Sequence, residues 1–443
     1  MLQTIRNAWK LPELRRSILF TIFILLIYRL GSVLPVPYVD SSFIGEMMGS
    51  STGIFQYFNI LSGEAFSKAN LFALSISPYI TAQIVMQLLT IAIPALERMA
   101  KEGDEGRKKI SRITRYVTVI LGIVTAIGYY TYIKNMPAMY GLTGVKTLTD
   151  DSFFATVVIV ACYSAGAALI MWLAEKINDH GIGNGISLIL LANIVARVPS
   201  LVISSISNIV TQIQAGALKV STLVISVLVV VIALAMIFFV VHMHSAERRI
   251  PVQYAKRQVG RRMYGGQNTY LPLKLNMTGV MPIIFASSIV ALPSTIGLMF
   301  GKDASSGGFW GGFLKLFSTQ NPLYAILTFV LIIAFAYFYI SISFNPIEVA
   351  NNLKKNGGSI LGIRPGKPTT DFIAKILSRI TLIGAIFLGL IATVPLIVGL
   401  VAEDWSILAF GGSSIIIVVG VIIETVTEIE TQMTMRHYKG FLE

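Results

Sequence analysis

Residue groups that could perform chemistry are few in this chain, and the first is a glycine-rich run. GIGNG, at 181–185, has glycines spaced as in loops that hold nucleotide phosphates on backbone N–H groups. A nucleotide-binding loop of that kind would follow a strand, whereas this run follows none and opens an apolar segment. We therefore interpret it as the flexible start of that segment, and the chain also lacks a P-loop.

Two histidines, His242 and His244, are spaced for one face of a strand and could suggest a metal ligand pair. They lack the cysteine or carboxylate company that would complete a site, so no metal is expected. No HExxH sequence is present, and no apolar segment holds a pair of carboxylates. The residues therefore predict neither an enzyme nor a bound cofactor.

The apolar segments carry almost no ionisable side chains. Arg29 lies towards the outer end of the first segment, where it could snorkel or pair, and Glu424 lies near the inner end of the last. A solute transporter usually places charged or cation-coordinating groups near the membrane midplane, and it has short cytoplasmic loops. The chain shows neither feature, so a secondary transporter is only our second hypothesis. An integral membrane enzyme is the third, because no catalytic cluster is visible.

The composition indicates a polytopic membrane protein. The chain has 443 residues, of which 54% are hydrophobic and 13% charged, with a mean hydropathy of +0.73. A soluble protein of this length could not bury so much apolar surface. A spanning helix needs roughly 20 apolar residues. Ten segments qualify: 17–36, 70–93, 113–134, 152–174, 183–203, 217–241, 275–297, 322–343, 376–400 and 407–427.

The positive charges predict the orientation of these segments. The net charge is +13, and Lys and Arg concentrate before the first segment and in alternate loops. Because basic loops stay on the cytoplasmic side, both termini are expected in the cytoplasm. Five segments per half invert the second half relative to the first, as in an inverted repeat. The predicted halves are 1–205 and 206–443, although no self-similarity between them is visible.

Two cytoplasmic loops, at 244–275 and 345–375, are unusually long. The first contains the β-like run RRIPVQYA and a turn at Gly265–Gly266, and the second a Gly/Pro-rich turn around Arg364. These loops could serve only as a topology signal with contact to lipid headgroups. Their length and charge suit a large acidic or phosphate-rich partner better, and ribosomal RNA would be such a surface.

Four stretches in chain order resemble the SecY family, the central channel subunits of the bacterial Sec protein translocon. They are SGEAFSKANLFALSISPYITAQIV, GIGNGIS, YAKRQVGRRMYGGQNTYLPLKLNMTGVMPIIFASS and NPIEVANNLKKNGGSILGIRPGKPT. The resemblance covers essentially the whole chain. It implies an all-α integral membrane protein whose ten transmembrane helices form two pseudo-symmetric inverted five-helix halves. It also implies a gated channel in the plasma membrane for secreted preproteins and for lateral release of membrane helices.

The resemblance also implies three sites along the pore. An apolar ring would form the waist, from Ile76, Ile80, Ile186, Leu190, Ile284 and Ile417. A short plug half-helix at about 53–67 would close it from outside, with Phe55, Phe58, Leu61 and Glu64. A lateral gate would carry Thr81, Gln87 and Asn276, whose hydrogen bonds across the seam would hold it shut. Plain helix packing without gating is the other interpretation of those polar residues.

The implied partners are a SecE and a SecG subunit, the SecA ATPase, the ribosome through its RNA, signal peptides, translocating polypeptides and membrane lipids. No cofactor is implied, because the energy comes from an external motor. The residues expected to dock SecA and the ribosome are Arg248, Arg249, Lys256, Arg257, Arg261, Arg262, Lys354, Lys355 and Arg364.

The chain departs from the family pattern around the expected plug. The family often has Gly-Gly where this chain has Gly63–Glu64, and Gly and Met where it has Ser75 and Ser77. A plug must leave into water when a polypeptide passes, which explains why it is not fully apolar. How tightly this plug is seated is therefore a question for the structure.

Overall fold

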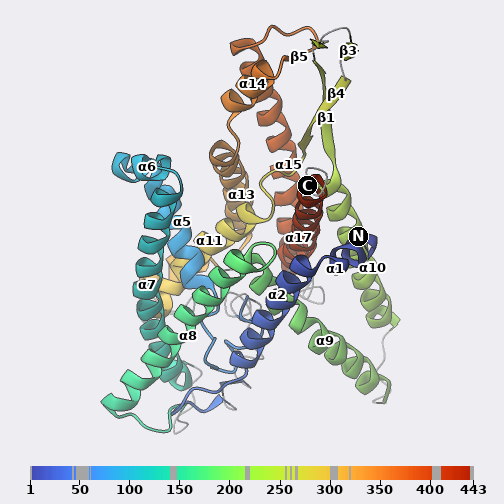
Figure 1. Cartoon of the computed structure of the whole chain (residues 1–443). Coiled ribbons are helices and arrows are strands. Elements are labelled where there is room, and N and C mark those ends of the chain that lie inside the picture. The colour runs from blue at the N-terminus through green and yellow to red at the C-terminus, as the bar shows by residue number, and fades with distance from the viewer. Residues whose placement is uncertain are drawn as a thin grey trace.

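A computed structural model of the chain consists mainly of long helices (Figure 1). The structure describes residues 2–41, 44–45, 59, 61–139, 147–214, 220–254, 257–259, 262–264, 268–299, 308–318, 321–401 and 411–439. Phe55 and Phe58 of the expected plug lie outside these residues, as do Lys256, Arg261 and the Gly265–Gly266 turn.

Each of the ten predicted segments coincides with a helix. The ten helices are α2 (Pro12–Gly31), α5 (Ser77–Ala92), α7 (Asp104–Met139), α8 (Phe153–His180), α9 (Gly185–Gln214), α10 (Val220–Ser245), α11 (Met281–Met299), α13 (Pro322–Ser343), α15 (Lys367–Val401) and α17 (Gly411–Lys439). Within the described residues, six helices are individually long and apolar enough to cross a membrane, and a bent pair would make seven. The chain is a multi-pass membrane protein.

The second segment differs most from its prediction. Its helix α5 begins at Ser77 instead of residue 70, because Ser75 has a left-handed φ of 53° that interrupts the helix before it. At the other end Ile93 is extended, and α6 (Pro94–Lys101) leaves at 99°. Pro94 is the first residue of α6, where a missing backbone N–H costs no hydrogen bond.

The two long loops fold into one compact unit with short strands, called here the cytoplasmic unit after the side predicted for it. Strand β1 (Glu247–Tyr254) pairs antiparallel with β4 (Asn268–Lys274) and β5 (Gly358–Ile360), in the order β4-β1-β5. Strands β2 (Arg257–Val259) and β3 (Arg262–Tyr264) form a separate hairpin. The run RRIPVQYA was correctly predicted as a strand, whereas α14 (Pro346–Lys355) and the first turns of α15 replace much of the second expected loop.

This unit has its own apolar core beneath the sheet. Ile250 and Val252 of β1, Leu273 of β4 and Ile360 of β5 pack with Ile373 of α15, and all five are buried. Strand side chains alternate between faces, so Ile250 and Val252 of β1 point inward, whereas Arg249, Pro251 and Gln253 point outward. Arg248 lies at the start of the strand and is exposed as well, so the sheet gives both arginines a rigid support.

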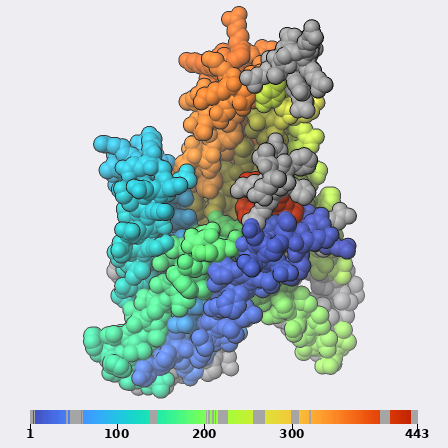
Figure 2. All heavy atoms as spheres, in the orientation of Figure 1, coloured from blue at the N-terminus to red at the C-terminus, as the bar shows by residue number. Residues whose placement is uncertain are grey.

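Helix α11 lies near the middle of Figure 1. It contacts α5 and α7 on one side and α13 on the other. Helices α13 and α15 pack together, and α17 packs against α9, α10 and α15. In Figure 2, α6 with the start of α7 and α14 with the end of α13 project from the same end of the molecule.

Two shorter helices were not predicted. The first, α1 (Leu2–Lys10), lies against the last helix, and Thr4 Oγ1 donates a 2.9 Å hydrogen bond to Glu430 Oε1. The N-terminal and C-terminal helices are therefore neighbours. The second, α12 (Gly308–Leu316), follows α11 and contacts it.

Candidate functional site

The six apolar residues expected in the ring lie in one buried cluster, where each is at most 6% exposed. Four of them line a small cavity: Ile80 of α5, Leu190 of α9, Ile284 of α11 and Ile417 of α17. The same cavity is also lined by Leu61, Ile194 and four serines: Ser287, Ser288, Ser413 and Ser414. The cavity has a volume of about 20 Å³, room for about one water molecule. Four helices that are distant in sequence thus converge on one point.

Ile76 and Ile186 belong to the same cluster but lie beside the cavity. Ile76 precedes α5, and Ile80 N donates to its carbonyl oxygen at 3.1 Å, so the two side chains stay one turn apart. Branched apolar side chains offer water and ions no hydrogen bond, and a narrow collar of them tends to be dry.

The plug segment, defined here as residues 59–69 where described, borders the cavity between the ring residues. Leu61 lines the cavity together with the ring residues and is 8% exposed. Helical structure in the described part ends at Ser62, and turns follow to Ala69. The expected half-helix therefore does not continue to Ser67.

The carbonyl oxygen of Leu61 accepts two side-chain hydrogen bonds. Asn193 Nδ2 of α9 donates at 2.6 Å and Ser75 Oγ at 2.8 Å. Both donors are almost fully buried, with Asn193 at 0% and Ser75 at 2% exposure. The sequence analysis missed Asn193, because a backbone acceptor leaves no signal in the residue types. Ser75, which departs from the family pattern, contributes to holding the plug segment in this structure.

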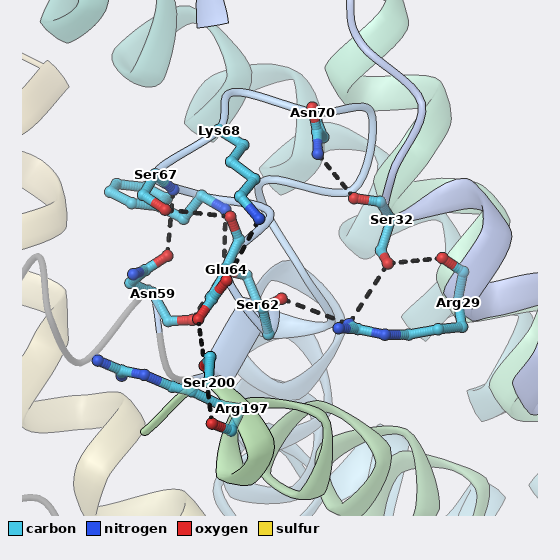
Figure 3. Close-up of polar contacts among 12 residues, drawn as sticks. Arg29, Ser32, Asn59, Ser62, Glu64, Ser67, Lys68, Asn70, Arg197 and Ser200 are labelled. Atoms are coloured by element: carbon cyan, nitrogen blue, oxygen red, sulfur yellow. Dashed lines mark hydrogen bonds and ion pairs between the residues drawn. The ribbon is translucent and has the colours of Figure 1, made fainter. Parts of the chain in front are cut away.

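Gly63 lies closely packed between α2 and α9. Arg29 Nη1 donates to its carbonyl oxygen at 3.3 Å and to Ser32 Oγ at 3.4 Å (Figure 3). Arg29 was expected to snorkel or pair, and its partner here is the backbone of the plug segment. A Cβ at residue 63 would lie 2.8 Å from Arg29 Nη1 and 2.9 Å from Asn193 Oδ1, and φ is +61°. Glycine is therefore required by both sterics and conformation.

Glu64 follows with a left-handed φ of 72°. Its carboxylate pairs with Lys68 Nζ at 3.3 Å and accepts a hydrogen bond from Ser200 Oγ of α9 at 2.9 Å (Figure 3). Farther along, Tyr163 Oη of α8 donates to the carbonyl oxygen of Ala69 at 3.0 Å. The plug segment is thus held by polar side chains from several helices.

The seam between α5 and α7 on one side and α11 on the other encloses an apolar cavity of about 220 Å³. Thr81 of α5 lines it, and so do Leu61 and Phe66 of the plug segment and Ala291 of α11. Gln87 lies one or two turns beyond Thr81, and its buried Oε1 has no hydrogen-bond partner in the described part of the chain.

Asn276 has different partners from those expected. Its Nδ2 lies 3.2 Å from His244 Nε2 of α10 and donates to the carbonyl oxygen of Gly279 at 3.0 Å. Thr278 Oγ1 donates to its Oδ1 at 3.1 Å. Among the described residues, Asn276 therefore does not form the expected hydrogen bonds with Thr81 and Gln87. It stabilises the turn that precedes α11 instead.

His242 and His244 lie on helix α10, not on a strand. Residues two apart on a helix point in different directions, and accordingly His242 is exposed whereas His244 is 6% exposed. Among the described residues no group of three His, Cys, Asp or Glu side chains could hold a metal ion.

The expected docking residues lie on the folded cytoplasmic unit. Arg364 lies in the turn between Gly362 and Gly366, both of which have left-handed φ angles, and it is exposed. Thr369 Oγ1 donates to the carbonyl oxygen of Arg364 at 2.9 Å and supports this turn. Arg248 and Arg249 on β1 and Lys354 and Lys355 on α14 are exposed. Arg257 and Arg262 lie on the paired strands β2 and β3.

Comparison with known proteins decides the family. The SecY family model matches residues 70–426. The chain belongs to the SecY family. It is 43% identical to the protein translocase subunit SecY of Streptomyces galbus and 41% identical to that of Mycobacterium tuberculosis, in each case over the full length of both chains. As a SecY-family member, it is a channel subunit of a protein translocase and not an enzyme.

Solved structures share the SecY fold. A structure described as a protein conducting channel aligns with a TM-score of 0.68 at 18% identity, covering 97% of both chains. Sec61 in the canine ribosome–channel complex aligns with a TM-score of 0.64 at 17% identity and 97% coverage of both chains. These similarities support the ten-helix membrane fold.

Proposed function

We propose that the six ring residues form the constriction of the translocation pore and that the plug segment closes it in the resting channel. The observation that carries this proposal is the small cavity shared by Ile80, Leu190, Ile284, Ile417 and Leu61. An apolar collar with no fixed ligands opposes ion passage and can still fit around a polypeptide of any sequence. Opening then requires Leu61 to leave and the four helices to separate.

The seam between α5–α7 and α11–α13 is the lateral gate in this proposal. An apolar cavity of about 220 Å³ already lies there, lined by Thr81 and by plug residues. The apolar helix of a signal peptide would replace the contacts of α11 with α5 and α7, and would disturb Leu61 and Phe66 as it did so. Lateral exit of membrane-protein helices into lipid would follow the same route.

The cytoplasmic unit is the docking surface for the driving partner. Rigid support and accessible arginines suit acidic protein and phosphate, since a guanidinium presents a planar fork to either group. The solved Sec61 and yeast Ssh1 relatives are described in complexes with ribosomes. We infer that this chain binds the ribosome and the SecA ATPase through this surface, and that it assembles with SecE and SecG subunits.

The proposed function also predicts how the chain is oriented in the membrane. The basic cytoplasmic unit and α1 would lie on the cytoplasmic face of the bacterial plasma membrane, with both termini inside. Residues 1–205 and 206–443 would form the two inverted halves, with the pore between them.

Reconstitution with SecE and SecA tests this function. Proteoliposomes should protect a secretory precursor from protease only when ATP is supplied, because SecA is the energy source. Vesicles without the chain provide the control. Absence of ATP-dependent protection, together with uptake of a small solute, would support the transporter hypothesis instead.

A further inference from the structure

Glu64 has three cationic residues drawn around it in Figure 3: Arg29, Lys68 and Arg197. Lys68 Nζ is 3.3 Å from its carboxylate, and Arg29 binds the carbonyl oxygen of Gly63 next to it. Ser200 of α9 lies next to Glu64, and the side chain of Arg197 extends from the same helix beside it. Ser200 Oγ lies 2.9 Å from Glu64 Oε1 and 2.8 Å from the carbonyl oxygen of Arg197.

Arg197 is incompletely paired in this arrangement. Its Nη1 is buried and has no hydrogen-bond partner within the described residues. A buried guanidinium nitrogen without a partner is costly, and a nearby carboxylate offsets part of that cost. The side chain of Glu64 is 29% exposed, so solvent screens this attraction less than it would at an open surface.

The backbone conformation of Glu64 also indicates that its side-chain contacts are stabilising. Its φ of 72° is a conformation that residues other than glycine adopt at a cost in energy. A glutamate at this position therefore carries a backbone penalty that its side-chain contacts must offset. Those contacts join the plug segment to α9.

Helix α9 carries the ring residue Leu190 and the residues that contact the plug segment on one face. Leu190, Asn193, Arg197 and Ser200 are spaced by three, four and three residues, which places them on one helix face. Leu190 lines the collar cavity, Asn193 binds Leu61, and Ser200 binds Glu64. A movement of α9 that widens the ring would also pull on the plug segment.

We propose that Glu64, Arg197 and Ser200 form an electrostatic latch, which holds the plug segment on α9 and sets how strong a signal sequence must be to open the channel. This proposal rests on the assignment of residues 59–69 as a plug. Without the Glu64 carboxylate, Lys68 would lose its ion-pair partner and Ser200 its acceptor, and the plug segment would leave more readily.

Labelling of a buried position in the plug segment measures its release. Ala65 is 1% exposed, and the chain has one native cysteine, Cys162. In a Cys162→Ser background, Ala65→Cys provides a thiol that a water-soluble maleimide reaches only when the segment leaves. The protein would be assayed with its SecE partner in lipid nanodiscs, where both faces are accessible.

Glu64→Gln and Arg197→Gln should each raise the labelling rate about three- to tenfold, as expected for removal of a partly buried ionic interaction. Ser200→Ala, a change on an exposed helix position, should give a smaller increase. Glu64→Gln combined with Arg197→Gln should raise the rate by less than the product of the two single effects, because each change removes the same interaction. Added salt should accelerate labelling of the parent and leave Glu64→Gln unchanged.

Glu97→Gln is the matched control, because Glu97 pairs with Lys101 four residues on, as Glu64 pairs with Lys68. It lies on α6 and should not change labelling. Equal labelling of parent, Glu64→Gln and Arg197→Gln would overturn the latch, and so would a double variant whose effect is the full product of the two single effects. If the substitutions do not change labelling while ATP-dependent translocation persists, only the latch proposal is contradicted. The plug proposal is contradicted separately if an engaged precursor does not accelerate labelling of the parent.

Discussion

The side-chain amide of Asn193, in the middle of α9, donates a 2.6 Å hydrogen bond to the backbone carbonyl oxygen of Leu61. The two residues are 132 positions apart in the chain. Leu61 contributes its side chain to the collar cavity and its carbonyl oxygen to this bond. One residue thus connects the closure of the pore to a helix that lines it.

Asn193→Leu should loosen the plug segment. Ser75 still binds Leu61, so the cost should be about 1 kcal/mol, the usual contribution of one hydrogen bond. Export of a precursor with a defective signal sequence should rise several-fold in cells. Thr211→Val removes a hydroxyl bond on the exposed surface of the same helix and should have no effect. Unchanged export in Asn193→Leu would mean that the bond does not restrain the plug.

Gly63→Ala should displace the plug segment more strongly. The new methyl group would lie within 3.0 Å of Arg29 Nη1 and Asn193 Oδ1, in a backbone conformation that disfavours alanine by about 1 kcal/mol. Gly103→Ala separates the two effects, since Gly103 has φ +79° but nothing within 4 Å of a Cβ. Conductance of the resting channel in planar bilayers should increase for Gly63→Ala and stay at the parent level for Gly103→Ala.

Replacing Ile80 and Ile284 together with serine should make the resting channel leak ions persistently. Both line the collar cavity, which four serines also line, so two small polar side chains in place of branched apolar ones would widen the constriction and stabilise water in it. Deletion of residues 53–67 should instead produce brief openings, because the collar remains. Val85→Ser with Ile296→Ser changes more exposed apolar residues of the same two helices and should not leak. A silent Ile80–Ile284 variant would show that these positions are not the constriction.

Asn276 and Gln87 should affect gating differently. Asn276→Leu removes three interactions around the turn before α11 and leaves His244 Nε2 without its neighbour, so it should destabilise the start of a gate helix. Gln87→Leu removes a buried oxygen that has no partner in the described part of the chain. The substitution should therefore destabilise the fold only slightly or stabilise it. Thermal unfolding and export of signal-defective precursors would measure both effects. Equal effects of the two substitutions would contradict this distinction.

Arg364→Glu should abolish SecA-dependent translocation while the protein still inserts and folds. Arg364 is exposed on a turn that contains two left-handed glycines, and the reversed charge would repel acidic or phosphate groups. Binding of SecA and of ribosomes should both weaken by at least about tenfold, because an attractive charge pair in the interface becomes a repulsive one. Lys315→Glu, an exposed lysine on α12, is the control. If SecA and ribosomes bound the variant as tightly as the parent, the interpretation of the cytoplasmic unit as a topology signal would be supported instead.

The sequence by itself determined the membrane architecture, because burial of about 20 consecutive apolar residues in a bilayer is a local property of each segment. All ten predicted segments coincide with helices, and the basic strand at 247–254 was also predictable from its residues. The ring residues could be named by resemblance, and their apolar character fitted a collar. The late start of α5 was not predictable, since it depends on the left-handed conformation of Ser75.

Tertiary structure alone decided which groups meet. Gly63 and Leu61 are held through backbone carbonyl oxygens, which every residue possesses, so the sequence could not identify Arg29 and Asn193 as their donors. Asn276 was predicted at a helix seam, but packing brought it beside His244. Apolar periodicity predicts helices because burial depends on neighbours along the chain, whereas a hydrogen bond between distant segments depends on how the helices pack.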